Sequence, residues 1–165
     1  MDVNARSRTI HWTDPATLTR TAKTMSGLDY MRGVRDGAIE EPPIARVLEY
    51  RVVEVEEGRV VFEMVPSEYH YNPFGAVHGG VASSIMDATA GATVYTTLPA
   101  GVTHASLDLK VNFVRPITMD TGRIRCEGRI VHRGRRVAIA EARLTDMKGE
   151  LYAVGNSTCM ILGST

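Results

Sequence analysis

The sequence predicts an α+β fold in which one antiparallel β-sheet wraps around a single long, buried α-helix. The helix is indicated by residues 81–98, which are small or apolar on almost every face, a composition typical of a buried helix. The sheet is indicated by segments before and after the helix in which apolar and polar residues alternate. Tight turns join most of these segments, so neighbouring strands should run antiparallel, and a lone buried helix must be covered by that sheet.

The first 44 residues are expected to form a helical arm in front of this domain. An Asp-Pro pair at 14–15 is typical of a helix start, and apolar residues at 28, 31 and 34 form a narrow stripe that stops near a glycine. The proline pair at 42–43 then interrupts the chain. We therefore divide the chain into an arm, residues 1–44, and a main domain, residues 45–165.

The predicted strands follow in a simple order. Residues 49–56 and 59–65 are rich in valine, tyrosine and phenylalanine and are joined across Glu57 and Gly58, which predicts a hairpin. A loop rich in proline, asparagine and glycine then leads into the helix. After the helix, further strands are predicted at residues 106–113, 123–130, 137–145 and 151–162.

The composition narrows the classes of partner and compartment. A chain of 165 residues suits one domain with a sizeable core, and its 19 basic and 19 acidic side chains cancel, so we expect no nucleic-acid and no membrane partner. The two cysteines, Cys126 and Cys159, form no CxxC pair, which predicts neither a disulfide framework nor a zinc site. The N-terminus lacks the apolar stretch of a signal peptide, so a cytoplasmic location is expected.

Asp87 is the most informative single residue. It is the one ionisable side chain within the predicted buried helix, where an unpaired carboxylate would be costly. Two explanations are open at this point: a reacting group, or an acid that pairs with a neighbouring segment.

Gly79 and Gly80 lie where this helix is expected to begin. Backbone N–H groups at a helix start lack intrahelical partners, and glycine lets a substrate carbonyl approach them closely. Such donors can hold a developing oxyanion. Asp87 lies about 12 Å further along the helix at 1.5 Å per residue, so one chain cannot easily join the two groups. We therefore expect a shared site in a dimer with antiparallel central helices.

These residues carry a family resemblance. Asn72, His78-Gly79-Gly80, Asp87 and Gly91 together resemble the PaaI-type thioesterases of the hotdog superfamily, and Leu109 to Pro116 resembles their central strand. The resemblance covers roughly residues 45–162 and leaves the arm outside. It implies a hotdog fold, an acyl-CoA substrate and a homodimer, with a dimer of dimers as a further expectation. It implies no metal ion and no separate cofactor. Coenzyme A enters as part of the substrate.

The resemblance also implies roles for individual residues. Asp87 matches the family's catalytic carboxylate, as general base or nucleophile, and the Gly79 N–H matches the group that polarises the thioester oxygen. His78 would orient this loop and help to bind the carbonyl, and Asn72 would position water or the nucleophile. Ser106 matches a water-holding hydroxyl, although Thr103 and His104 are close competitors for that place.

Simpler explanations exist for most of these residues. His78 can be only a helix cap, Asn72 only a turn residue and Ser106 only a solvated strand residue. The arginine-rich turn at residues 133–136 can bind the phosphates of coenzyme A, or it can be only an exposed basic turn. The acyl group would contact Gly80 and a set of apolar side chains. The expected binding residues are Gly80, Phe74, Val77, Met86, Tyr95, Arg133, Arg135 and Arg136.

Three functions differ in which of these residues they require. The first is hydrolysis of acyl-CoA to a free acid and CoA, the second a non-catalytic acyl-CoA-binding hotdog protein, and the third a hotdog hydratase or dehydratase. A non-catalytic binder should lack the carboxylate that this chain keeps, and a hydratase expects a different placement of histidine and acid. Serine hydrolase, zinc hydrolase and phosphate-loop chemistry lack their motifs here. Hydrolysis is therefore the leading prediction.

Overall fold

The computed structural model describes residues 5–163 and has a six-stranded antiparallel sheet curved around one long helix. The sheet order is β1-β2-β4-β5-β6-β3, and every pair of neighbours is antiparallel. The strands are β1 (Tyr50–Glu56), β2 (Arg59–Met64), β3 (Thr103–Phe113), β4 (Ile124–Arg133), β5 (Val137–Asp146) and β6 (Leu151–Leu162). The predicted α+β architecture is thus confirmed.

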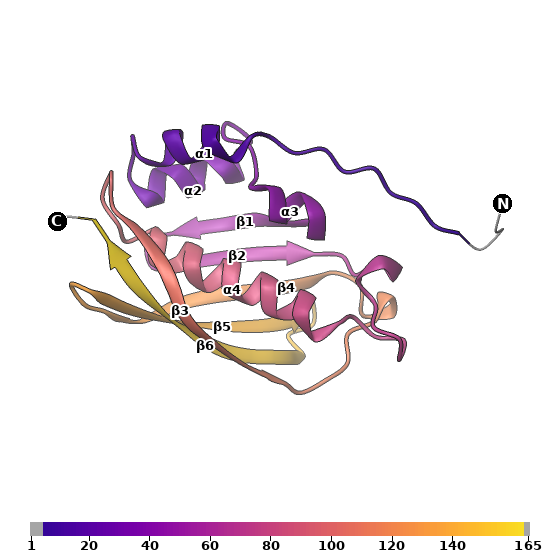
Figure 1. The fold of residues 1–165 in the computed structure, drawn as a ribbon. Helices are drawn as coiled ribbons and strands as arrows, with labels where there is room; N and C mark the ends of the chain where they lie inside the picture. Colours follow the sequence, from indigo (N-terminus) through magenta and orange to yellow (C-terminus); the bar gives the residue numbers. More distant parts are fainter. Residues whose placement is uncertain (1–4, 164–165) are drawn as a thin grey trace.

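Helix α4 (Gly79–Tyr95) lies against the concave face of this sheet, as Figure 1 shows. Its sheet-facing side chains, among them Ile85, Met86 and Val94, are fully buried. Buried Thr89 and Thr93 donate their hydroxyl protons to the carbonyl oxygens four residues earlier, at 2.7 and 2.8 Å. The polar groups of the buried face are therefore satisfied within the helix itself.

A glycine in the sheet lets α4 approach closely. A Cβ atom at Gly128 of β4 would lie 2.2 Å from Thr93 Oγ1 and 3.0 Å from a Thr89 methyl carbon. Any larger residue at this point would push the helix away from the sheet. The opposite side of α4, which carries Ala88 and Ala92, is only half-buried in one chain. The prediction that α4 is buried on every side is therefore wrong for the single chain.

The arm contains two helices, α1 (Pro15–Ala22) and α2 (Gly27–Arg35), and a third, α3 (Pro43–Leu48), leads into β1. Asp14 caps α1 and accepts a hydrogen bond from the Ala16 N–H, as an Asp-Pro start predicts. In Figure 1, α1 and α2 lie together over the β1 edge of the sheet. Buried apolar side chains of α2 join the same core as the sheet, so the arm and the main domain share one hydrophobic core.

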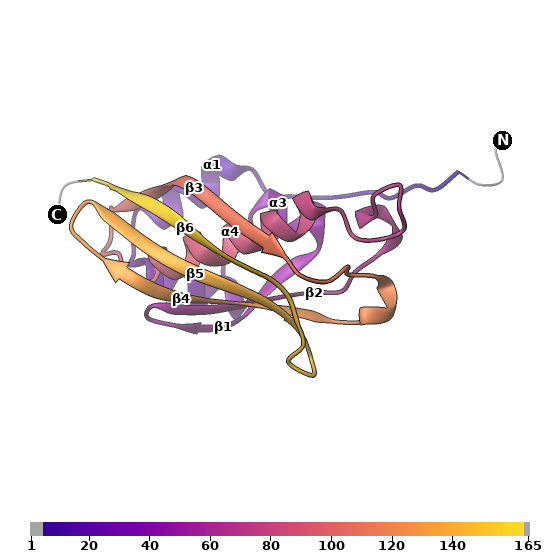
Figure 2. The same ribbon diagram turned by 90° about the horizontal axis from the view of Figure 1, so that it is seen from below.

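Strand β3 lies at the free edge of the sheet, beside β6, as Figures 1 and 2 both show. Within one chain, the segment that resembles the family's central strand is therefore an edge strand. A register shift between Ser106 and Asp108 interrupts its alternation, and Leu107 and Phe113 are 56% and 53% exposed. An apolar strand with one unpaired edge is a suitable surface for pairing with another chain.

Candidate active site

Asp87 projects from the middle of α4 and meets Ser106 on β3. The Ser106 hydroxyl donates a hydrogen bond of 2.9 Å to Asp87 Oδ1. Asp87 is half-buried, so its carboxylate is held by Ser106 and still remains accessible to a ligand. The two residues are 19 positions apart in sequence, and the structure brings them together because β3 crosses the half-buried side of α4.

A cleft of about 270 Å³ opens beside Asp87. Its walls come from the arm, from β1 and β2, from α4 and from β3, and they are mainly apolar. The lining residues are Tyr30, Met31, Val34, Glu41, Pro42, Ile44, Ala45, Tyr50, Arg51, Val52, Phe62, Asp87, Ala88, Gly91, Ala92, Tyr95, His104 and Ser106. A concave apolar space with few polar groups is the usual form of a small-molecule site.

Tyr50 is a polar group of this cleft that the sequence did not reveal, because it reads as an ordinary strand aromatic. Its side chain is 2% exposed and packs edge-on against Phe62, with ring centroids 5.5 Å apart. Burial, and then the nearby charges of Asp87 and Glu41, raise the pKa of Tyr50 above its usual value. The hydroxyl is therefore a neutral hydrogen-bond donor at physiological pH.

His104 lies on the same wall, between Tyr95 and Gly91. Its ring centroid is 6.0 Å from that of Tyr95, and its Nε2 atom would be 2.9 Å from a Cβ placed on Gly91. Burial lowers the pKa of His104, and the Asp87 charge opposes this shift. Gly91, part of the family resemblance, thus makes room for the imidazole. Of the three candidates considered on this strand, Ser106 is the one that donates a hydrogen bond to Asp87.

The start of α4 forms a second, separate site. His78 is the N-cap, and its Nδ1 atom accepts a 2.9 Å hydrogen bond from the Gly80 N–H. The expectation that both glycine amides are free is therefore wrong for Gly80. Within residues 5–163, the Gly79 N–H has no hydrogen-bond acceptor. Because Nδ1 accepts, a neutral His78 carries its proton on Nε2, which is a further hydrogen-bond donor of the residue before Gly79.

A cleft of about 390 Å³ lies at this helix start and is lined by Asn72, Val77, Gly79 and Phe113, among others. Asn72 Oδ1 accepts hydrogen bonds from the backbone N–H groups of Phe74 and Ala76, at 2.8 and 3.3 Å. Asn72 therefore shapes the loop before His78, as its simpler explanation requires, and also borders the Gly79 cleft.

Buried His70 supports the loop that leads into α4, a role that the sequence did not predict. Its carbonyl oxygen accepts a 2.8 Å bond from the His78 N–H, and its Nδ1 accepts a 3.1 Å bond from the Ser67 N–H. The ring is 2% exposed, and burial lowers the pKa of His70. A neutral imidazole is thus part of the scaffold that holds the helix start.

The two clefts share no lining residue. Asp87 is eight positions after Gly79 on α4, which corresponds to about 12 Å along the helix axis. One chain therefore presents the carboxylate and the amide donor as two half-sites. Of the predicted binding residues, Tyr95 lines the Asp87 cleft and Val77 the Gly79 cleft.

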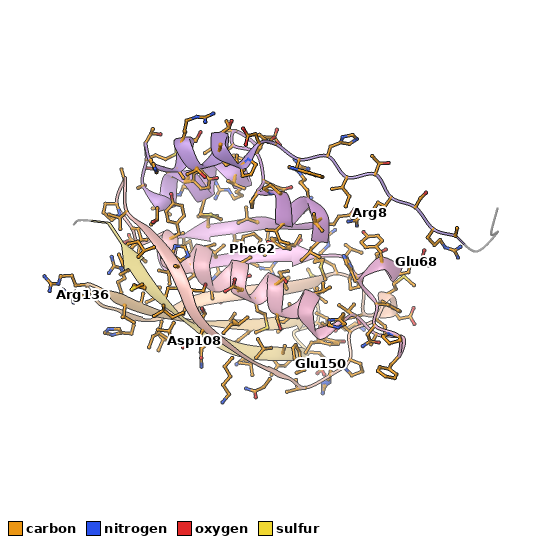
Figure 3. All side chains as sticks on the ribbon, viewed as in Figure 1. Arg8, Phe62, Glu68, Asp108, Arg136 and Glu150 are labelled. Atoms are coloured by element: carbon orange, nitrogen blue, oxygen red, sulfur yellow. The ribbon has the colours of Figure 1, made fainter. Side chains whose placement is uncertain are left out.

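Other predicted binding residues lie away from both clefts. Phe74 is 92% exposed on its loop, and Met86 is fully buried beneath α4. Arg133 donates to the Thr97 hydroxyl at 3.0 Å and to the Gly134 carbonyl oxygen, while Arg135 and Arg136 are exposed. Figure 3 shows Arg136 at the end of the sheet opposite to Glu68 and to the start of α4. Within one chain the arginine turn is therefore remote from Gly79.

No group of three or more histidine, cysteine, aspartate or glutamate side chains within the described part of the chain could hold a metal ion. Between residues 5 and 163, no helix has the length and apolar character needed to cross a bilayer.

The sequence of this chain is similar to the sequences of known proteins. Residues 74–153 match the family model described as the thioesterase superfamily. A protein of Saccharolobus solfataricus named as an esterase is 31% identical over 119 residues, which are 72% of this chain and 83% of that protein. Acyl-coenzyme A thioesterase 13 of Mus musculus is 27% identical over 130 residues, 78% of this chain and 91% of the relative.

Solved structures agree with these sequence matches. A Ralstonia eutropha protein, named as a thioesterase related to phenylacetic acid degradation, superposes with a TM-score of 0.72 at 28% identity and covers 79% of this chain and 98% of its own. The PaaI protein of Escherichia coli superposes with a TM-score of 0.73 over 85% of this chain and 99% of its own. Its identity of 17% makes that second match a likeness of fold.

Proposed function

Because the chain belongs to the hotdog-fold thioesterase superfamily, we propose that it hydrolyses acyl-CoA thioesters to the free carboxylic acid and CoA. The observation that carries this proposal is the half-buried Asp87 carboxylate, which meets the Ser106 hydroxyl at the mouth of an apolar cleft. The cleft offers a place for an acyl group, and the carboxylate supplies the basic group that hydrolysis needs.

The second half of the reaction needs an electrophilic group. The Gly79 N–H, at the positive end of the α4 dipole, is suited to hold the thioester oxygen. We assign the reaction to a site formed by Asp87 of one subunit and Gly79 of another. The distance between the two groups within one chain supports this assignment, as do the exposed edge of β3 and the half-buried alanines of α4.

The reaction then follows in balanced steps. Asp87 takes a proton from a water molecule that Ser106 helps to orient, and the hydroxide attacks the carbonyl carbon. The negative charge that develops on the thioester oxygen is held by the amide donor, and the carbon–sulfur bond breaks when the oxyanion collapses. The proton held by Asp87 passes to the CoA thiolate. In the alternative course Asp87 attacks the carbonyl carbon itself, and the carbon–sulfur bond breaks to release the CoA thiolate. Water then hydrolyses the resulting anhydride, which restores the Asp87 carboxylate, releases the acyl group as its acid and supplies the proton that the thiolate takes up.

The test is free thiol release from a panel of acyl-CoAs, with Asp87→Asn compared with the wild type. Asp36→Asn is a matched control, because Asp36 is an exposed carboxylate at the end of α2, away from β3, and borders neither cleft. We expect Asp87→Asn to lower kcat by a factor on the order of 10² to 10⁴, the usual contribution of general acid–base catalysis, and the control to match the wild type. Binding of acyl-CoA without turnover would indicate a non-catalytic binding protein, and full activity of Asp87→Asn would exclude the role of Asp87.

A further inference from the structure

The N-terminal arm is fixed firmly to the end of α4. The Gly27 N–H donates a 3.0 Å hydrogen bond to the Leu98 carbonyl oxygen, and the Tyr95 hydroxyl donates a 3.1 Å bond to the Ala22 carbonyl oxygen. A Cβ atom on Gly27 would lie 1.8 Å from the Tyr95 carbonyl oxygen, so only glycine lets α2 begin at this position. The arm is therefore held in one place relative to the catalytic helix.

One face of α2 is turned toward the Asp87 cleft. Tyr30, Met31 and Val34 line the cleft from this helix, and Met31 and Val34 are each 7% exposed. Ile44 and Ala45 extend the same wall from the start of α3. These side chains are apolar or aromatic, so the arm supplies a mainly apolar surface to the cleft, with Glu41, which pairs with Arg46 at 3.3 Å, as its charged lining residue.

This wall lies outside the part of the chain that matches the family model. The match begins at residue 74, whereas α2 ends at Arg35 and α3 ends at Leu48. Asp87, Ser106 and the helix start belong to the matched part, and the arm does not. The groups assigned to the reaction therefore lie inside the matched part, whereas the wall formed by α2 and α3 lies outside it, as do strands β1 and β2.

We propose that α2 and the start of α3 form the wall that limits the size of the acyl group, and that the enzyme prefers compact acyl groups to long ones. This inference rests on the proposed thioesterase function. The cleft volume of about 270 Å³ is at the small end of the ~300–1,000 Å³ that small-molecule sites usually have. An acyl group whose carbonyl carbon lies at Asp87 would extend along the cleft toward the arm, and we expect a long chain to be limited by this wall.

The test is a series of straight-chain acyl-CoAs from acetyl to palmitoyl, with kcat/KM measured for each. Ile44→Ala enlarges the cleft and Ile44→Trp fills it, and Ile44 is suited to both changes because it is 48% exposed and contributes little to the core. Met31→Ala enlarges the cleft at a buried position. Arg32→Ala is the control, because Arg32 lies on the exposed side of α2 and does not border the cleft.

We expect the two alanine variants at the wall to favour longer chains than the wild type does. The ratio of kcat/KM for the longer to the shorter substrate should rise by about 10-fold, the usual effect of one or two methylene groups in an apolar pocket. Ile44→Trp should change that ratio in the opposite direction. Acetyl-CoA is too short to reach the arm, so its kcat/KM should stay close to the wild-type value in every variant, and Arg32→Ala should follow the wild type throughout.

Two failures can be told apart. If the wild type hydrolyses acyl-CoAs but the wall variants alter every chain length by one common factor, or alter none, the arm does not limit the acyl group and the inference is wrong. If the wild type releases no thiol from any substrate, the proposed function is wrong. The same series is then measured as dissociation constants by titration calorimetry, where an unchanged chain-length profile in the variants would overturn the inference as well.

Discussion

Gly79 offers a direct test of the amide donor, because two substitutions at this position differ in little except the N–H group. Gly79→Pro removes the N–H, and Gly79→Ala keeps it. Gly79 is the first residue of α4, where proline is well tolerated since no intrahelical bond uses that N–H. The preceding residue, His78, has φ −60° and ψ 135°, the extended conformation that a residue before proline prefers.

Both substitutions add a Cβ atom at position 79, so they share the steric effect of that atom. A Cβ atom at position 79 would lie 3.2 Å from Phe113 Cζ, and the Phe113 ring is 53% exposed and free to turn away. The free energy of unfolding should therefore change by a similar, small amount in both. Removal of one oxyanion donor lowers kcat by a factor of about 10² to 10³, or about 2.7–4 kcal/mol of transition-state stabilisation.

The assay is kcat for thiol release at saturating acyl-CoA, with urea unfolding of both variants as the control for folding. We expect Gly79→Ala to keep most of the wild-type kcat and Gly79→Pro to lose two to three orders of magnitude. Equal kcat values in two equally stable variants would refute the role of the Gly79 N–H.

Three further predictions follow from the same contacts. If the site is shared, mixing Asp87→Asn with Gly79→Pro chains should restore up to about a quarter of the wild-type sites, because each mixed dimer regains one intact site; no recovery after proven subunit exchange would contradict it. Ser106→Ala removes a hydrogen bond to a half-buried carboxylate and should lower kcat about 10-fold, with KM little changed and with Ser106→Thr restoring activity; a change in KM alone would point to a substrate contact instead. The lowered pKa of His70 means that the unfolded chain binds its proton more readily, so this contribution to stability is complete above about pH 6.5 and is lost as the pH falls through the folded-state pKa. Urea unfolding between pH 7.5 and 5 should show that loss, and His70→Gln should show less of it, since glutamine can still accept the Ser67 N–H bond.

The repeating patterns of the chain were enough to predict its architecture. Strands β1 to β6 follow the predicted segments within a few residues, because alternation along a strand records which side faces a core. The central helix was found for a similar reason, since small and apolar residues over many turns indicate close contact with a sheet. Asp87 stood out only because this pattern surrounds it.

Sequence patterns predicted the residues that line the cleft less well. Phe74 and Met86 were predicted to contact the acyl group, yet one is exposed on a loop and the other is buried beneath α4. Tyr30, Tyr50 and His104, which do line the cleft, are far apart in sequence and belong to a helix, a strand start and an edge strand. No spacing rule connects them, because their proximity results from how the arm and β3 are placed around α4.

By itself, then, the amino-acid sequence determined the α+β architecture, the carboxylate within the helix and its distance from the glycine amides, since helix rise converts residue spacing into length. The cap of α4 by His78 was among the local explanations that the sequence offered, because it joins residues two positions apart. Only the tertiary structure decided that Ser106 meets Asp87 and that the arm closes one side of the cleft. These contacts join residues 19 or more positions apart, and they depend on the shape of a packed core, which no local pattern encodes.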